Sequence, residues 1–178
     1  MDLACDVKRL HTLATKAVMM AAMMRFAPPL AFALLALLAL PAAAEKYGLS
    51  HNENLRFLDD MAHKPGILKL PQGVMVRVLA SGKGEAVTGR ADKVTVSYNG
   101  YLINGVRFGG TLPGKPQVFT VSRVVPGWTE ALLQMHEGDS WEVIVPADQA
   151  YGEGSAGNIP PDQSLLFVIR LEHVEHPS

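Results

Sequence analysis

The sequence predicts an α+β domain in which an antiparallel β-sheet packs on one short helix. Apolar and polar residues alternate, with many β-branched side chains, along the runs 93–102 and 164–174, which is typical of strands. Asn104 and Gly105 form the strongest short hairpin signal, so the strands beside them are expected to run antiparallel. The helix is expected over residues 126–135, with proline in its first turn.

The first expected element is a further helix, ahead of the sheet, that begins near residue 50. Ser50 or Asn52 can cap its N-terminus, and the pair Pro65-Gly66 ends it. Its apolar stripe is narrow and consists of Leu55, Leu58 and Met61. A helix of about three turns is marginally stable alone in water, so we expect it either to pack on the domain or to fray.

The remaining elements are strands joined by turns rich in glycine and proline. We expect strands over residues 74–79, 93–102, 107–108, 117–121, 140–145 and 164–174. Residues 146–163 differ, because this segment is long and has no regular pattern. Loops of that length in a compact domain are usually functional or disordered, and the apolar and aromatic residues in this one favour a functional loop.

The N-terminal region has the three parts of a secretory signal peptide. Arg25 precedes an uninterrupted apolar run, 31–40, and the small residues 41–44 follow it. The run is too short to span a bilayer comfortably, and it lacks the amphipathic period of a buried helix, which is the alternative interpretation. We therefore expect residues 1–44 to be a signal peptide that is cleaved after Ala44.

Residues 1–19 precede a signal that is already complete from Met20 or Met24, and we hypothesise that translation starts at one of these two methionines. Cys5, the only cysteine of the sequence, precedes the cleavage point. The mature protein would then contain no thiol, no disulfide and no cysteine metal ligand. A cysteine-free exported domain suits an oxidising compartment, so we expect a periplasmic or secreted location.

The charge of the mature region excludes some classes of partner. From Glu45 onward there are 12 Lys and Arg and 15 Asp and Glu, so the net charge is 12 − 15 = −3. This balance argues against nucleic acid or anionic lipid as a partner. His173 and His176 end the chain, and an offset of three on a strand places them on opposite faces. We therefore expect no metal site and no cofactor.

Two motifs in a fixed order carry the most specific signal. The first is V-V-P-G-W-T-E-A-L-L-Q-M at 124–135, and the second is P-A-D-Q-A-Y-G-E-G-S-A-G-N-I-P-P at 146–161, with the strand S-W-E-V-I-V-P between them. Together they resemble the FK506-binding (FKBP) family of peptidyl-prolyl cis-trans isomerases. The resemblance covers about residues 72–174, and it implies a strongly curved antiparallel sheet wrapped around one short α-helix.

The resemblance divides the chain and names a site. After the signal peptide at 1–44 and the short helical extension at 45–70, it implies an FKBP-type isomerase domain at 71–178. The implied catalytic residues are Tyr98, Phe108, Trp128, Tyr151 and Phe167, and the implied substrate-binding residues are Val124, Val125 and Ile159. In the family, the Trp supports the proline ring, the Tyr of A-Y-G donates its hydroxyl to a substrate carbonyl, and the backbone N–H at the position of Val125 binds a second carbonyl. Any one of these aromatic residues could instead be plain core, and Phe167 fits both roles.

The implied function is catalysis of the rotation about X-Pro bonds in exported proteins. The implied ligands are proline-containing unfolded or partly folded polypeptides and FK506-like macrolides. No nucleic acid is expected as a partner, and no stable membrane span after cleavage. We expect a monomer, because the extension is too short for the long helical stalk through which some relatives dimerise; an interaction domain that dimerises through this extension is the alternative.

The sequence departs from the family pattern beside the expected pocket. The usual Phe-Asp pair is Phe108-Gly109 here, and the family Asp lies next to the tyrosine that corresponds to Tyr98. Loss of that carboxylate keeps open a second function, a proline-directed binding or chaperone module of the same fold with weak catalysis. The aromatic residue often found shortly after Pro116 is also absent, since Gln117 or Val118 stands there.

Overall fold

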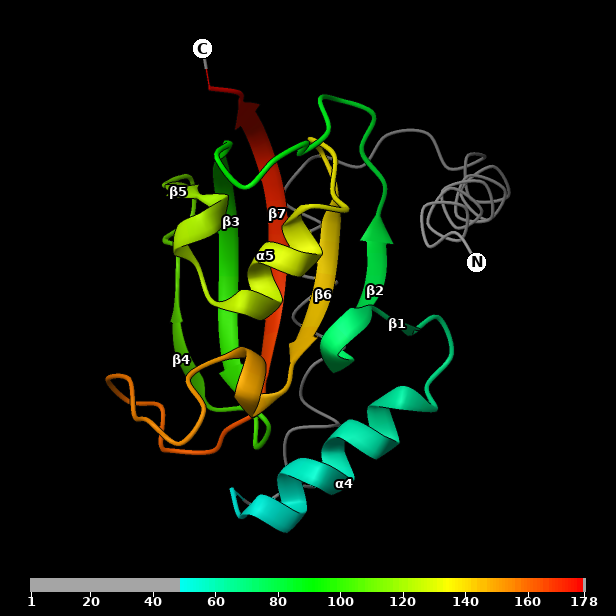
Figure 1. Cartoon of the computed structure of the whole chain (residues 1–178), viewed down its shortest axis with the longest axis vertical. Coiled ribbons are helices and arrows are strands. Elements are labelled where there is room, and N and C mark those ends of the chain that lie inside the picture. The colour runs from blue at the N-terminus through cyan, green and yellow to red at the C-terminus, as the bar shows by residue number, and fades with distance from the viewer. Residues whose placement is uncertain (1–48, 178) are drawn as a thin grey trace. The chain divides into compact units, whose positions relative to one another are not determined.

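A computed structural model of the chain describes residues 49–177. The expected signal peptide, its cleavage point and the alternative start sites lie outside the described residues. The elements are α4 (His51–Ala62), β1 (Leu68–Lys69), a 3₁₀ turn (Pro71–Gly73), β2 (Met75–Ala80), β3 (Lys93–Leu102), β4 (Arg107–Gly110), β5 (Gln117–Thr120), a 3₁₀ turn (Val121–Arg123), α5 (Pro126–Leu132), β6 (Ser140–Val145), a 3₁₀ turn (Ala147–Gln149) and β7 (Leu165–Glu175) (Figure 1). Within residues 49–177, no helix is both long and apolar enough to cross a bilayer.

The strands form one antiparallel sheet in the order β1-β2-β6-β7-β3-β4. β5 also pairs with β3, along the first half of that strand, whereas β4 pairs with its second half. The register shifts within the β2–β6, β3–β4 and β3–β7 pairs, and such irregularities bend strands and increase their twist. The predicted α+β class with an antiparallel sheet is confirmed.

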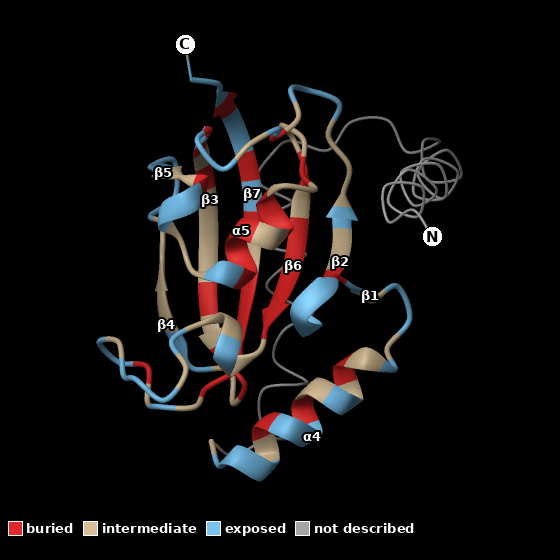
Figure 2. Cartoon of the chain, in the orientation of Figure 1, coloured by how far each residue is buried: buried red, intermediate tan, exposed pale blue. Residues whose placement is uncertain are grey.

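α5 packs across one face of the sheet, and the main core lies between them (Figure 2). Pro126 starts the helix, where its missing N–H costs nothing. Gly127 allows the helix to approach β6 closely, since a Cβ at this position would lie 2.5 Å from Val145 Cγ1. The helix ends at Leu132, three residues before the predicted end at 135. The core side chains are Val94, Val96, Trp128, Ala131, Leu132, Met135, Trp141, Val143, Ile169 and Leu171.

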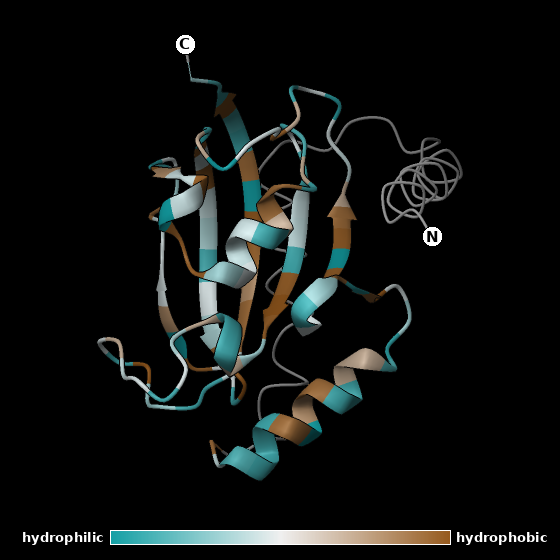
Figure 3. Cartoon of the chain, in the orientation of Figure 1, coloured by the Kyte–Doolittle hydropathy of each residue, from teal (hydrophilic) through white to brown (hydrophobic). Residues whose placement is uncertain are grey.

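α4 begins where the sequence predicts, but it buries a different stripe. Ser50 is the N-cap, and its hydroxyl accepts the backbone N–H of Glu53 at 3.3 Å. The side of the helix that is buried carries Asn54, Phe57 and Met61. Leu55, which the periodicity placed on the apolar stripe, is 52% exposed, so that part of the prediction is wrong. Hydrophobic and hydrophilic residues alternate along α4 in the pattern of an amphipathic helix (Figure 3).

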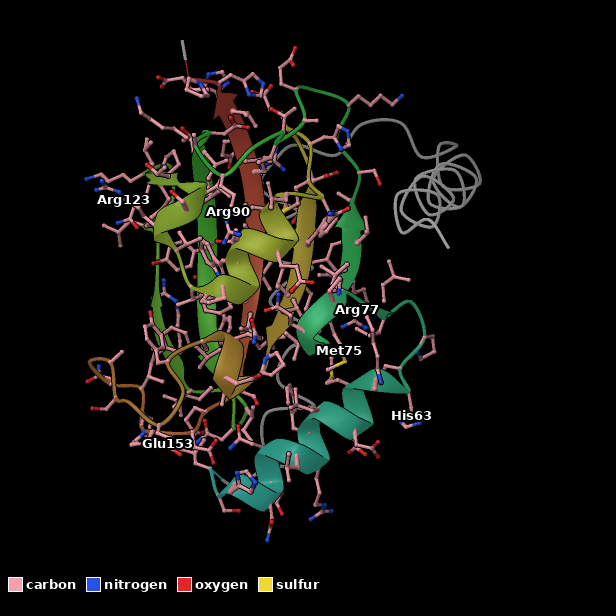
Figure 4. All side chains as sticks on the ribbon, in the orientation of Figure 1. His63, Met75, Arg77, Arg90, Arg123 and Glu153 are labelled. Carbon is pink, nitrogen blue, oxygen red and sulfur yellow. The ribbon has the colours of Figure 1, made fainter. Side chains whose placement is uncertain are left out.

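A smaller set of buried apolar residues lies apart from the main core. Met75, Ile144 and Leu166 alternate along their strands with main-core residues, so they occupy the sheet face opposite α5. The side chain of Met75 extends toward α4 (Figure 4). Phe57 and Met61 of α4 are also buried, and Asn54 of α4 is hydrogen-bonded to Ser164, so α4 packs on the domain rather than fraying.

Two carboxylates near the C-terminal end of β7 make stability depend on pH. Burial raises the pKa of Asp92, but the backbone N–H groups of Thr88 and Gly89, together with His176, outweigh it and hold the pKa below the ordinary 3.8. The N–H of Val174 and the ring of His173 hold the pKa of Glu137 below the ordinary 4.5, against a smaller opposing effect of burial.

We therefore expect the protein to lose stability in acid. A carboxyl group with a lower pKa in the folded state stabilises the fold fully above its unfolded-state pKa, and this contribution disappears as pH falls through the folded-state value. The free energy of unfolding in urea should be constant near pH 6 and fall below about pH 4.5. Glu137→Gln should remove part of that pH dependence. An unfolding free energy at pH 3 equal to that at pH 6 would contradict this account.

Candidate functional site

The centre of the candidate site is the indole ring of Trp128 on α5. It is only 4% exposed, and three aromatic rings surround it edge-on. The ring centroids of Tyr98, Phe167 and Phe119 lie 4.9, 5.1 and 5.8 Å from that of Trp128, with interplanar angles of 89°, 82° and 79°. Edge-to-face pairs at these distances are favourable and fix ring orientation. Trp128 is therefore a rigid apolar platform.

Phe108 extends the aromatic cluster on the side of β4. Its ring lies 5.6 Å from that of Phe167, again edge-on. Gly100 of β3 makes this packing possible, since a Cβ there would lie 2.6 Å from Cζ of Phe108 and 3.1 Å from Cε1 of Phe167. The close approach of the Phe108 and Phe167 rings to β3 therefore requires glycine at position 100. Four of the five predicted catalytic residues, all except Tyr151, thus meet in one cluster of rings.

Phe119 is a member of this cluster that sequence reasoning did not identify. The family pattern points instead to Gln117 and Val118, where an aromatic residue is absent. The available signal was the period of two along residues 117–121, which puts Phe119 on the same side as Val121, and the structure buries Val121 fully. Phe119 turns inward to Trp128 and Tyr98, whereas Val118 is 62% exposed.

Tyr151 lies at the exposed edge of the site, in the loop of residues 146–163, which we call the site loop. Tyr151 is 44% exposed. Burial raises the pKa of the Tyr98 hydroxyl above its usual 10.0, Tyr151 raises it further, and Arg107 opposes the rise. The electrostatic effect of Tyr151 on Tyr98 means that the two phenols lie near each other. Within residues 49–177, neither hydroxyl forms a hydrogen bond, so both can act as donors to a ligand.

The three predicted substrate-binding residues surround the same platform. Val124 and Val125 directly precede α5, are half-buried and pack against the main core. The carbonyl of Val125 accepts the N–H groups of Trp128 and Thr129, while its own N–H makes no hydrogen bond within the described part of the chain. Ile159, from the site loop, is 5% exposed and belongs to the same apolar core as Trp128.

The place of the missing family carboxylate is sterically open. Gly109 pairs with Gly100 across β3 and β4, so a side chain at 109 would project from the same sheet face as one at 100. A Cβ on Gly109 would have no atom within 4 Å apart from those of residues 108–110. The next residue, Gly110, has φ +145°, and a Cβ there would lie 2.6 Å from the carbonyl oxygen of Tyr98. The positive φ that favours glycine therefore occurs at Gly110 and not at Gly109.

The site is apolar, with a few polar groups at its edge. Its chemistry is that of a rigid aromatic floor with two hydroxyls and one backbone N–H that make no hydrogen bond within residues 49–177, which suits an uncharged group such as an amide. Among residues 49–177, no group of three or more His, Cys, Asp and Glu side chains is arranged to hold a metal ion.

Comparison with known proteins gives one family. A profile of the FKBP-type peptidyl-prolyl cis-trans isomerases matches residues 84–172. The outer membrane protein MIP of Legionella longbeachae is 49% identical over 121 residues, which cover 67% of this chain and 52% of that protein. The FKBP-type 22 kDa peptidyl-prolyl cis-trans isomerase of Escherichia coli K12 is 40% identical over 121 residues, 67% of this chain and 58% of the relative. The chain thus spans little more than half the length of these relatives.

Solved structures agree with this result. A peptidyl-prolyl cis-trans isomerase from Pseudomonas syringae pv. tomato superposes with a TM-score of 0.66 at 34% identity, over 70% of this chain and 92% of that one. The crystal structure of FkpA from Escherichia coli also gives a TM-score of 0.66, at 27% identity, over 94% of this chain and 82% of that one.

Proposed function

This chain belongs to the FKBP-type peptidyl-prolyl cis-trans isomerase family, and we propose that it catalyses cis–trans rotation of X-Pro bonds in polypeptide substrates. The observation that carries the proposal is the geometry around Trp128. Three rings hold this indole edge-on, at 4.9 to 5.8 Å, and Tyr151, whose hydroxyl makes no hydrogen bond within residues 49–177, acts electrostatically on Tyr98 of the same cluster. A flat apolar floor with a donor beside it fits a proline ring and the carbonyl next to it.

The rate gain needs no proton transfer and no metal. Amide resonance gives the peptide bond a rotation barrier of roughly 18–20 kcal/mol. The planar amide is more charge-separated than the twisted transition state, so an apolar site disfavours the ground state more. Hydrogen bonds placed for the twisted geometry add differential binding. A thousandfold acceleration requires about 4 kcal/mol in total.

Each residue has a defined role in this proposal. Trp128 is the floor under the proline ring, and Tyr98, Phe108 and Phe167 keep it apolar and rigid. The Tyr151 hydroxyl donates to one substrate carbonyl, and the backbone N–H of Val125 donates to a second. Val124 and Ile159 complete the apolar walls of the site. The proposed site residues are therefore Tyr98, Phe108, Val124, Val125, Trp128, Tyr151, Ile159 and Phe167.

We further propose that the protein acts outside the cytoplasm. The relative in Legionella longbeachae is named an outer membrane protein, and the start of this chain has the pattern of a secretory signal. The proposed substrates are exported proline-containing chains that are unfolded or partly folded. FK506-like macrolides are proposed ligands of the same apolar floor, and the protein is proposed to act as a monomer.

A second candidate function is supported by Gly109. Without the family carboxylate, the site could bind proline segments as a chaperone does and catalyse rotation only weakly. One experiment separates the two candidates: isomerisation of an Ala-Leu-Pro-Phe peptide and binding of the same peptide, measured on the mature chain. Acceleration of isomerisation well above the spontaneous rate supports the enzyme, and saturable binding without acceleration supports the binding module.

Tyr151→Phe should lower kcat/KM only modestly. The substitution removes one hydroxyl and keeps the ring, so the loss should be about one hydrogen bond, roughly fivefold. Because Tyr151 is 44% exposed, the melting temperature should hardly change. A loss of a hundredfold or more would contradict the proposed role and would indicate that Tyr151 does more than donate one hydrogen bond.

Catalysis should be independent of pH between about pH 6 and 8. Burial and Tyr151 both raise the pKa of Tyr98 above 10.0, so this hydroxyl stays protonated throughout that range. The measurement is kcat/KM for the same peptide at half-unit intervals. A bell-shaped profile would contradict a mechanism without acid–base groups.

A further inference from the structure

Two buried side-chain amides connect α4 to the site loop. Asn54 and Gln163 are 3% and 5% exposed. The Asn54 carboxamide oxygen accepts the backbone N–H of Ser164 at 2.7 Å. Its nitrogen donates to the carbonyl of Ser50 at 3.0 Å and to Oε1 of Gln163 at 3.4 Å. Both ends of the amide on α4 are thus hydrogen-bonded, and two of its three bonds reach the segment where the site loop joins β7.

Gln163 continues this connection in both directions. Its nitrogen donates to the carbonyl of Leu49 at 3.0 Å, just before α4, and to the carbonyl of Pro161 at 3.0 Å, inside the site loop. In addition, His51 in the first turn of α4 contacts the carboxylate of Asp162. Asp162 has φ +57°, a conformation that is uncommon for residues other than glycine. The end of the site loop is therefore held in an unusual turn by contacts that come from α4.

A helix that only covers apolar surface does not need such groups. Phe57 and Met61 already give α4 a buried apolar side. Buried amides add cost unless every donor and acceptor is paired, and a paired network fixes one arrangement more sharply than apolar contacts do. The network of Asn54 and Gln163 therefore specifies the position of the loop end relative to α4.

That position bears directly on the site. The N–H of Asp162 donates to the carbonyl of Gly152 at 2.7 Å, which closes the base of the site loop one residue after Tyr151. Ile159 and Ala156 exchange backbone hydrogen bonds at 2.9 and 3.1 Å, so Ile159 moves with its turn. Ile159 therefore lies inside the segment 152–162 that this hydrogen bond closes, and Tyr151 lies directly before it.

We infer that Asn54 and Gln163 are positioning residues of the isomerase site: through them α4 fixes the site loop, and with it Tyr151 and Ile159, against the platform of Trp128. This inference rests on the proposed function. It makes α4 a working part of the catalytic unit, although α4 lies in the segment that sequence analysis assigned to an extension.

The test compares variants of the full mature chain that remove the amides with one that weakens only apolar packing. Asn54→Leu and Gln163→Met keep approximate side-chain size and remove the hydrogen bonds. Phe57→Leu, on the same side of α4, is the matched control for stability. For each variant the measurements are kcat and KM for the Ala-Leu-Pro-Phe peptide well below the melting temperature, the melting temperature itself, and amide hydrogen exchange across residues 152–164.

We expect Asn54→Leu and Gln163→Met to lower kcat/KM by roughly fivefold, as small misplacements of binding groups do, and to speed exchange in the site loop. Phe57→Leu should lower the melting temperature to a similar extent without either effect. Equal kcat/KM in the amide variants and the control, or unchanged exchange in the loop, would overturn the inference. If the unmodified chain shows no isomerase activity, the proposed function fails, whereas loop exchange still decides whether the amides position the loop.

Discussion

Trp128→Ala is expected to lower kcat/KM at least a hundredfold and to weaken FK506 binding by about 3 kcal/mol. The indole is the contact that Tyr98, Phe119 and Phe167 share, so its removal takes away the floor and leaves three rings without their common partner. Both effects follow from lost apolar surface, and they should appear together. A substitution that only removed a polar contact would affect turnover more than binding.

Stability must be separated from function in this experiment. Truncation of a buried aromatic residue costs about 3–5 kcal/mol, which is a large part of the stability of a small domain. Trp128→Phe is the control, because it keeps an aromatic ring and most of the buried area. This variant should remain folded and keep much of the ligand affinity. Efficiency of folded Trp128→Ala close to that of the unmodified chain would remove Trp128 from the site.

Fluorescence supplies an independent measurement. The sequence has two tryptophans, and Trp141 is 1% exposed in β6. In a Trp141→Phe background, emission reports on Trp128 alone, and binding of FK506 should shift it. Unchanged emission at saturating ligand would mean that the ligand does not contact the indole.

The strands of this fold could be predicted from the sequence because one rule, the alternation of side chains between the two faces of a sheet, sets each of them. β3 spans the predicted residues, and β7 lies one residue from its predicted bounds. Both have regular alternation of side chains, which a half-buried sheet requires. The hairpin after β3 forms at Asn104 and Gly105, where Gly105 has φ +82°.

The side of α4 that is buried could not be read in this way. Periodicity selected Leu55, which is exposed, and passed over Asn54, which is buried. Asn54 faces inward because its amide is paired with Ser164 and Gln163, residues more than a hundred positions away. No local pattern carries that information, since hydropathy treats a paired and an unpaired amide alike. Phe119 differs, because the family pattern points to an aromatic residue at 117 or 118, whereas here the aromatic residue stands at 119.

Gly109 offers a test of how closely this site follows its family. The family has a carboxylate beside the tyrosine that corresponds to Tyr98. In this chain the residue at that place is Gly109, which has no side chain. Three features favour restoring it: the space beyond Gly109 is open, its φ is not left-handed, and the Tyr98 hydroxyl is not hydrogen-bonded within residues 49–177. Arg107 already acts electrostatically on Tyr98, so a positive charge is near enough to compensate a new negative one.

Gly109→Asp is therefore expected to raise kcat/KM by roughly tenfold, because a polar contact to Tyr98 would be regained in the transition state. Gly110→Ala is the matched control at the next position. Its Cβ would lie 2.6 Å from the Tyr98 carbonyl oxygen, and its φ of +145° suits only glycine, so this variant should lose stability and activity together.

The cost of burying a carboxylate works against the expected gain. If Tyr98 and Arg107 do not satisfy the new group, Gly109→Asp should lower the melting temperature and give no gain in kcat/KM. If they do satisfy it, the melting temperature should be nearly unchanged, and Tyr98→Phe should abolish the gain. Unchanged or lower kcat/KM in a stably folded Gly109→Asp variant would mean that the rest of this site has adapted to glycine. The family carboxylate would then have no role that could be transferred to this chain, and the weakly catalytic binding module would gain support.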